Sequence, residues 1–321
     1  MEKREPAQSS TIALRDSQQD LTEIASFANR LLLLFLVSYG LSSIVVRIVQ
    51  RSMKSTLVDD LSHILLLCFS LILVAVAGSR LFRTTPKQIV LGERTAPKLQ
   101  SMDSCLLTLS LFFFEYGILL LSLPVLKTSS PDEFNPEPLF YLMIAIIGPC
   151  ILGPMNEEIL FRRIGFQYSQ KYGTMFAVIT SSIMFAFAHG DRIQFLYALL
   201  LGICAGILCA KTGSVLWPIL LHMAHNGFNI VMAYLFPFYE GIPSFRFYLL
   251  WFVFAVLCVI CFLLYATRQK ISLRNISIKV SMRTFWTQMR SDQSKYKAYF
   301  TSVGGLGFIV LAIINWLGGL T

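Results

Sequence analysis

Charged residues are scarce in this chain of 321 residues: only 14% are Asp, Glu, Lys or Arg, while 55% are hydrophobic. A soluble domain carries roughly a quarter charged residues, so the composition excludes an ordinary soluble protein. The chain also lacks an internal repeat, a low-complexity tract and an extra soluble domain. We therefore expect an integral membrane protein.

Two common hydrolase signatures are absent as well. The sequence contains neither GxSxG nor HExxH, so serine hydrolase and zincin chemistry lose their usual support. All seven cysteines lie in apolar runs, including the pair Cys258-Val-Ile-Cys261. We expect buried, reduced thiols rather than a redox or metal site. No secretory signal follows the polar N-terminus, and we expect the first apolar run to be an uncleaved span.

Long uncharged or nearly uncharged runs are what the sequence has instead. Several reach the length of about 18–20 residues that crosses a bilayer as a helix. They are continuously apolar rather than alternating, which favours helices over barrel strands. We predict an all-α, polytopic membrane protein with a bundle of eight or nine transmembrane helices. The runs lie at about 31–46, 61–79, 104–126, 138–155, 174–188, 193–210, 212–236, 247–267 and 300–320.

The runs and the charges suggest four parts. These are a polar N-terminal tail (1–25), N-terminal transmembrane helices (26–137), a core that carries the chemistry (138–236), and C-terminal transmembrane helices (237–321) with a basic loop at 268–299. The net charge of +9 is concentrated in that loop and in 80–98, whereas 127–138 is acidic. The positive-inside rule predicts a cytoplasmic N-terminus and cytoplasmic basic loops. Membrane lipids explain this charge, and we expect no nucleic acid partner.

Ionisable side chains at membrane depth cost about 2.5–3.5 kcal/mol each on insertion scales, so they are candidates for function. Each could also be a structural group that bonds a neighbouring helix, which is the reading we favour for Glu115. Gly202 and Gly206 predict close helix packing. The ionisable candidates are Glu115, Glu157, Glu158, Arg162, Arg163, His189, Lys211, His222 and His225.

Helix geometry predicts different roles for the two adjacent glutamates. Glu158 and Arg162 are four residues apart with the acid first, which is the favourable order for an ion pair. Glu157 points about 100° away and is left as a free carboxylate. The dipeptides Gly148-Pro149 and Gly153-Pro154 predict a kink in this helix.

The histidines complete a set of groups suited to activating water. His222 and Asn226 share one face of a helix, while His225 and Asn229 share a face rotated by about 60°, and spacing alone leaves open which pair faces a site. A desolvated glutamate can act as a general base, His189 can share or relay the proton, and an imidazole with an amide can donate hydrogen bonds to an oxyanion.

Taken in order, three motifs resemble those of the CPBP family, which comprises CAAX proteases and bacteriocin-processing enzymes. They are Glu157-Glu158-x-x-x-Arg162, Phe185-x-x-x-His189 and His222-x-x-x-Asn226. The stretch GICAGILCAKTGSVLWPILLH (202–222) is also similar to the family, and the resemblance covers about 145–230. Arg163 departs from the pattern, because the family commonly has Gly there.

The resemblance implies an intramembrane endopeptidase, similar to type II CAAX prenyl proteases. If the family's roles apply at the matching positions, Glu157 activates water and His189 assists it. His222 and Asn226 then form the oxyanion site, and Glu158 with Arg162 supports the architecture. The resemblance favours His222 over His225. We expect no cofactor, with zinc as the alternative, because a zinc site would use Glu157, His189 and His222 as ligands.

The expected function is hydrolysis of a peptide bond in a membrane-associated or lipidated peptide or protein, at a bacterial plasma membrane, in bacteriocin processing or self-immunity. A eukaryotic endomembrane CAAX protease is a second setting. The main alternative is a self-immunity or scaffold protein on the same fold that does not cleave, for which Arg163 leaves room. A transporter would show internal repeats, and this chain has none.

Overall fold

The described part of the computed structural model is helical and contains no β-strand. It comprises residues 6–40, 56–91, 99–122, 146–189, 192–235, 245–271 and 278–318. The predicted all-α fold is therefore confirmed. The acidic 127–138 segment lies outside the described residues.

The N-terminal part consists of long helices with little polar interruption. They are α1 (Pro6–Phe35), which continues as the π-helical segment η1 (Leu36–Gly40), then α3 (Thr56–Leu81), the short α4 (Pro86–Leu91) and α5 (Ser101–Ser122). α1 begins inside the predicted polar tail, well before the apolar run. A helix does not require apolar residues, because its backbone hydrogen bonds are internal to the segment.

The second half contains the segment with the motifs, and it is built from shorter pieces. These are η2 (Gly148–Leu152), α7 (Gly153–Glu158), η3 (Ile159–Phe166), α8 (Gln167–Ser169), η4 (Gln170–Tyr172) and α9 (Thr174–Phe187). Longer helices follow, namely α10 (Arg192–Thr212), α11 (Leu216–Leu235) and α12 (Phe245–Arg268). The chain then forms α13 (Ile278–Ser291), α14 (Gln293–Phe300) and α15 (Val303–Gly318).

Five of the described helices are long and apolar enough to cross a membrane, or six if the bent α14–α15 pair forms one span. The chain is therefore a multi-pass membrane protein, with fewer qualifying spans among these residues than the predicted eight or nine. The run at 174–188 forms a helix of only 14 residues. Residues 138–145 of the run at 138–155 lie outside the described residues.

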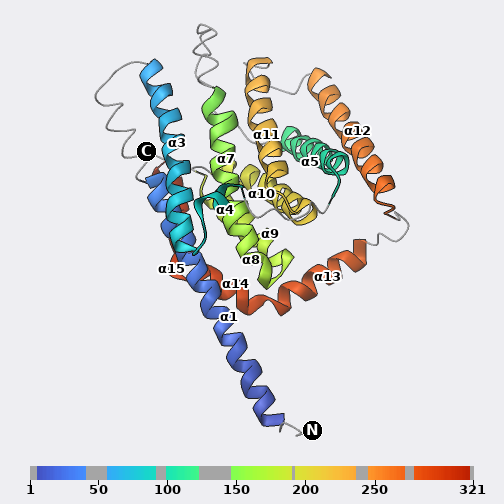
Figure 1. The fold of residues 1–321 in the computed structure, drawn as a ribbon. Coiled ribbons are helices and arrows are strands. Elements are labelled where there is room, and N and C mark those ends of the chain that lie inside the picture. Colours follow the sequence, from blue (N-terminus) through green and yellow to red (C-terminus); the bar gives the residue numbers. More distant parts are fainter. Residues whose placement is uncertain are drawn as a thin grey trace.

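The helices form a bundle in which segments far apart in sequence pack together (Figure 1). α12 packs along α5, α10 along α9, and α1 along α14 and α15. One large apolar core joins these helices, and a second core of Tyr116, Leu119, Leu120 and Phe254 joins α5 to α12. α7 contacts α3 on one side and α11 on the other.

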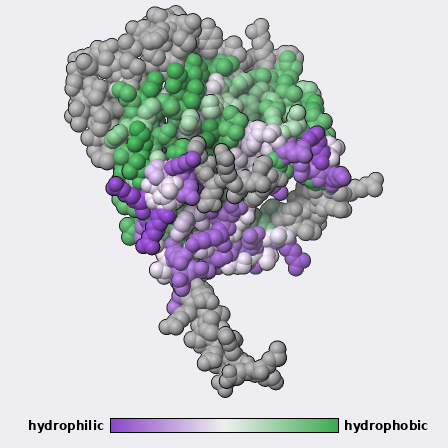
Figure 2. All heavy atoms as spheres, viewed as in Figure 1, coloured by the Kyte–Doolittle hydropathy of each residue, from purple (hydrophilic) through white to green (hydrophobic). Residues whose placement is uncertain are grey.

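Apolar side chains are exposed on the outside of the bundle. Figure 2 shows a band of hydrophobic residues across the visible face, with hydrophilic residues gathered below it. Large side chains such as Leu65 (69% exposed) and Ile72 (59%) point outward. An exposed apolar surface of this extent is a liability in water but suits contact with lipid.

Small residues let α9 and α10 approach closely, as the Gly202 and Gly206 spacing predicts. A Cβ added at Gly202 would lie 3.1 Å from the Cα of Ser182, and one at Gly206 would lie 3.2 Å from Val178 Cγ1. This contact holds α9, which ends just before His189, against the rest of the bundle.

Candidate active site

The helix that carries the paired glutamates is interrupted on both sides by π-helical segments, η2 and η3. The N–H of Gly153 donates to the carbonyl of Gly148, five residues earlier. If this five-residue hydrogen-bond spacing continued, the next donor would be the N–H of residue 154 and its acceptor the carbonyl of Pro149. Because proline has no N–H, the Pro149 oxygen is left available to another donor. π-Helical turns of this kind occur frequently at functional sites.

Asn226 of α11 uses this acceptor. Its Nδ2 donates to the Pro149 oxygen at 2.7 Å. The π-helical turn at these Gly-Pro dipeptides, where a kink was predicted, exposes a carbonyl that fixes the third motif against the first. An amide carries two N–H donors, so Asn226 retains one for another acceptor.

Glu158 and Arg162 form the buried ion pair that their spacing predicts. Arg162 Nε lies 3.2 Å from Glu158 Oε2, and both side chains are fully buried. The guanidinium also lies over the ring of Phe185, 4.2 Å from its centroid. An opposite charge and an aromatic face both stabilise a desolvated guanidinium.

Glu157 points elsewhere, as expected, and meets two histidines. Its Oε2 lies 3.8 Å from Nε2 of His189 and 4.0 Å from Nε2 of His222. About a quarter of the Glu157 and His189 side chains is exposed, whereas His222 is almost fully buried. Glu157 Oε2 has no hydrogen-bond partner among the described residues, and these separations are longer than a direct hydrogen bond.

The second nitrogen of each histidine defines the orientation of its ring. Nδ1 of His189 lies 2.8 Å from the carbonyl of Phe185, and Nδ1 of His222 lies 3.0 Å from Glu158 Oε1. A carbonyl and a carboxylate both accept, so each Nδ1 carries the proton. In the neutral rings both Nε2 lone pairs then face Glu157. Three acceptors around one point suit a molecule that donates protons, such as water.

Phe185 packs at the centre of these groups. Its ring centroid lies 4.6 Å from that of His189 and 5.5 Å from that of His222, both edge-on. Phe185 is fully buried. Tyr39, at the end of η1, also lies close enough to interact electrostatically with both Glu157 and Glu158. The sequence offered no signal for Tyr39, because it lies more than 100 positions away in the chain.

The other polar face of α11 is used as well. His225 Nδ1 contacts Glu115 Oε1 of α5 in a buried pair. The hydroxyl of Tyr116 donates to Asn229 Oδ1. The structure thus resolves which pair faces which neighbour: His222 and Asn226 face the motif segment, and His225 and Asn229 face α5. Glu115 has the structural partner expected of it, whereas Tyr116 was missed.

Arg163 forms hydrogen bonds to α8 and to α4. Its Nη1 donates to Gln167 Oε1, and its Nε and Nη2 donate to the carbonyl of Gln88. The residue that departs from the family pattern therefore ties η3 to α4. None of the seven cysteines, all of which lie in described helices, forms a disulfide bond.

Within the described ranges, no group of three or more His, Cys, Asp or Glu side chains is placed to hold a metal ion. A pocket of about 360 Å³ lies elsewhere, lined by Leu99, Gln100, Asp103, Arg268 and Gln269. None of the motif residues lines it.

Comparisons with known proteins agree with the motifs. The family described as Type II CAAX prenyl endopeptidase Rce1-like matches residues 139–228. YdiL of Bacillus subtilis (strain 168), described as a candidate membrane peptidase, is 34% identical over 90 residues, which is 28% of this chain and 37% of YdiL. The membrane-embedded CAAX protease MroQ of Staphylococcus aureus (strain USA300) is 29% identical over 107 residues, 31% of this chain and 41% of MroQ.

The match covers about two fifths of the length of these relatives. No solved structure is significantly similar to the chain. The residues of the three motifs, from Glu157 to Asn226, all fall inside the segment that matches the family. Residues 139–228 are therefore similar to the Type II CAAX prenyl endopeptidase Rce1-like family, and the resemblance predicted from the three motifs is confirmed.

Proposed function

We propose that this protein is an intramembrane endopeptidase that hydrolyses a peptide bond in a membrane-associated or lipidated peptide or protein. The observation that carries the proposal is the convergence of Glu157 Oε2 with Nε2 of His189 and of His222. A carboxylate and two imidazole lone pairs can orient one water molecule and accept a proton from it. The similarity of 139–228 to CAAX endopeptidases supports the same reaction.

In the proposed reaction Glu157 removes a proton from water, and the water oxygen attacks the carbonyl carbon of the substrate. The carbonyl oxygen becomes an oxyanion, and the proton then passes to the departing amine, so the peptide bond breaks with no other reactant. His189 is proposed to hold the water, because its ring is fixed by the bond of Nδ1 to Phe185. An approaching substrate displaces bulk water, which strengthens these interactions.

The oxyanion is proposed to be stabilised by His222 and Asn226. When the proton that Glu157 takes from water passes to Nε2 of His222, before it reaches the departing amine, the ring becomes a cation and can donate to the oxyanion, while Nδ1 still donates to Glu158. The Glu158 carboxylate thus stabilises the imidazolium, and Arg162 balances Glu158 when the ring is neutral. Asn226 contributes the N–H that is not bonded to Pro149. Preorganised donors of this kind typically contribute about 10²–10³ in kcat.

We propose that the reaction needs no metal ion. His222 Nδ1 and Arg162 already share Glu158, and Glu157 remains available as the base. The competing zinc hypothesis uses Glu157, His189 and His222 as ligands and leaves no separate base among them. Activity that survives 1,10-phenanthroline and exhaustive dialysis, with no zinc in the purified protein, supports the first hypothesis. Loss of activity that added zinc restores contradicts it.

The proposed setting is the plasma membrane of a bacterium, since both relatives are bacterial. MroQ is named a CAAX protease, and we extend that substrate class to this chain as a proposal. Processing of a bacteriocin or self-immunity is the role we propose to examine first.

The decisive experiment compares new peptide termini, by mass spectrometry, in membranes containing wild type or Glu157→Gln at equal levels. Glu157→Gln keeps the shape but removes the base, so termini found only with wild type are expected. Glu23→Gln is the matched control, because Glu23 pairs with Lys171 at the surface. Identical termini for wild type and Glu157→Gln would instead indicate a self-immunity or scaffold protein on this fold.

A further inference from the structure

Helix α13 (Ile278–Ser291) lies outside the bundle of spans, in the segment that the sequence predicts to be a basic loop. In Figure 1 it crosses the lower edge of the molecule, between the end of α12 and α14. α12 ends at Arg268, and α15 re-enters the bundle at Val303. α12 qualifies as a span, and so does the bent α14–α15 pair taken as one, so we expect α13 to lie near the level at which the chain leaves the membrane.

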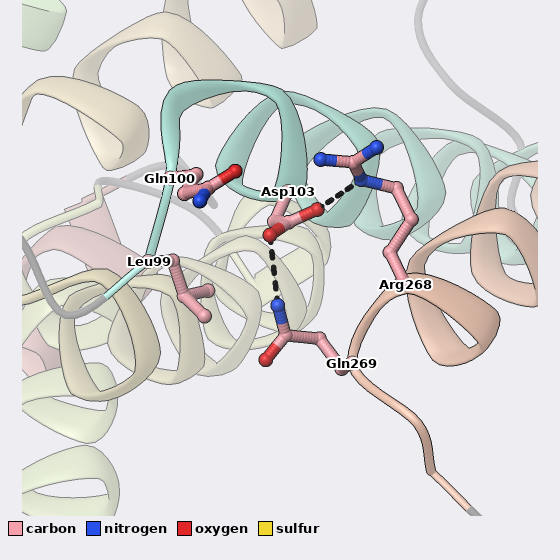
Figure 3. Close-up of a pocket in the computed structure, with 5 residues that line it drawn as sticks. All are labelled: Leu99, Gln100, Asp103, Arg268 and Gln269. Carbon is pink, nitrogen blue, oxygen red and sulfur yellow. Dashed lines mark hydrogen bonds and ion pairs between the residues drawn. The ribbon is translucent and has the colours of Figure 1, made fainter.

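The end of α12 is fixed by a buried carboxylate. Figure 3 shows Asp103 of α5 accepting hydrogen bonds from Arg268 and Gln269. Asp103 is 4% exposed, so two charge-assisted bonds hold the last turn of α12 against the start of α5. The chain that leads into α13 therefore starts from a fixed point.

One face of α13 is apolar and uncovered. Met282 (50% exposed), Phe285 (37%) and Trp286 (56%) lie three and four residues apart and so share this face. The rings of Phe285 and Trp286 pack edge-on, with their centroids 5.4 Å apart. Met289 continues the same face by register. Trp and Phe on one side of a helix are typical of a helix that lies in the membrane interface.

The flank of this face is basic. Arg283 and Arg290 are seven residues apart, next to Trp286 on the helical wheel, and both are exposed. The helix contains three basic residues, counting Lys279, and no acidic one. Neither arginine has an ion pair within the described residues, whereas nearby Asp292 is paired with Lys295. Guanidinium groups bind phosphate oxygens well.

We propose that α13 lies in the plane of the membrane surface and binds anionic phospholipid. Met282, Phe285 and Trp286 insert below the headgroups, and Arg283 and Arg290 contact lipid phosphate. The charge of the flank selects this occupant, because a polybasic helix beside transmembrane segments is attracted to anionic lipid. This proposal does not depend on the proposed peptidase function.

The test uses the full-length chain in nanodiscs of phosphatidylcholine, with or without phosphatidylglycerol. Either lipid carries bromine near the top of its acyl chains, which quenches tryptophan on contact. The difference between wild type and Trp286→Phe isolates the emission of Trp286 from that of the other three tryptophans. We expect Trp286 to be quenched by brominated lipid, more strongly by phosphatidylglycerol, and to be protected from iodide in the water.

The charge contribution is measured with Arg283→Gln and Arg290→Gln. Each is expected to lower the preference of Trp286 for brominated phosphatidylglycerol by about fivefold, which corresponds to about 1 kcal/mol per basic residue. Lys297→Gln is the matched control, since it removes a positive charge from α14 and leaves α13 unchanged. Quenching by iodide but not by brominated lipid would show that the apolar face meets water or a protein, and equal quenching by both lipids would show that anionic lipid is not bound. Either result overturns the proposal.

Discussion

Replacing Arg162 by Met tests how far the buried ion pair stabilises the fold. Arg162 Nε lies 3.2 Å from Glu158 Oε2, with both side chains fully buried. At that distance and an effective dielectric constant of about 20, the Coulomb attraction is about 5 kcal/mol. Removing one partner of a buried pair typically costs about 3–5 kcal/mol, because the other charge remains buried. The variant also loses the contact of the guanidinium with Phe185.

The assay is thermal unfolding of the full-length chain in detergent, for Glu158→Gln, Arg162→Met and the double variant. For domains of 150–250 residues, 1 kcal/mol shifts Tm by about 2–4 °C, so Arg162→Met is expected to lower Tm by on the order of 10 °C. The double variant leaves no unpaired charge. Its Tm is therefore expected to fall by much less than the sum of the two single losses. Additive losses would refute the reasoning. If Arg162→Met does not fold, Arg162→Lys, which keeps the positive charge beside Glu158, is expected to fold.

Two further predictions concern the packing around the candidate site. Pro154→Ala restores an N–H that competes with Asn226 for the Pro149 carbonyl. The rate of peptide cleavage is therefore expected to fall about tenfold or more, while Tm is unchanged or higher. A normal cleavage rate would show that the bond between Asn226 and Pro149 is not needed. Gly202→Ala places a Cβ 3.1 Å from Ser182 and 3.2 Å from Arg162 Nη2, so Tm is expected to fall by an amount equivalent to about 1–3 kcal/mol. Gly227→Ala, where no atom lies within 4 Å of the added Cβ, is its control and is expected to leave Tm almost unchanged.

Periodicity and spacing predicted the parts of the site that lie close together in the chain. The ion pair of Glu158 with Arg162 and the separate direction of Glu157 follow from the geometry of one helix. The Gly-Pro dipeptides predicted a kink, and the structure forms a π-helical turn there. The approach of His189 to Glu157 needed the resemblance to suggest it, because 32 positions separate the two residues. The catalytic roles themselves stay predictions.

Contacts between distant helices were beyond the reach of the sequence. Nothing local indicates that Tyr116 bonds Asn229, or that Tyr39 lies near the glutamates. The basic segment 268–299 was interpreted from its charge alone, and so its two helices, α13 and α14, were missed. The spacing of Met282, Phe285 and Met289 was the signal that could have revealed α13.

The orientation of α11 shows why the four polar residues on it act as one unit. His222, His225, Asn226 and Asn229 occupy an arc of about 100° on the helix. Glu158 and Pro149 bind the first and third, while Glu115 and Tyr116 bind the second and fourth. A rotation of α11 by one residue would break all four contacts and leave Glu115 and Glu158 without these partners. Buried polar groups are costly to leave unpaired. The contacts with α5, far from Glu157 in the chain, therefore help to fix the orientation in which His222 faces Glu157.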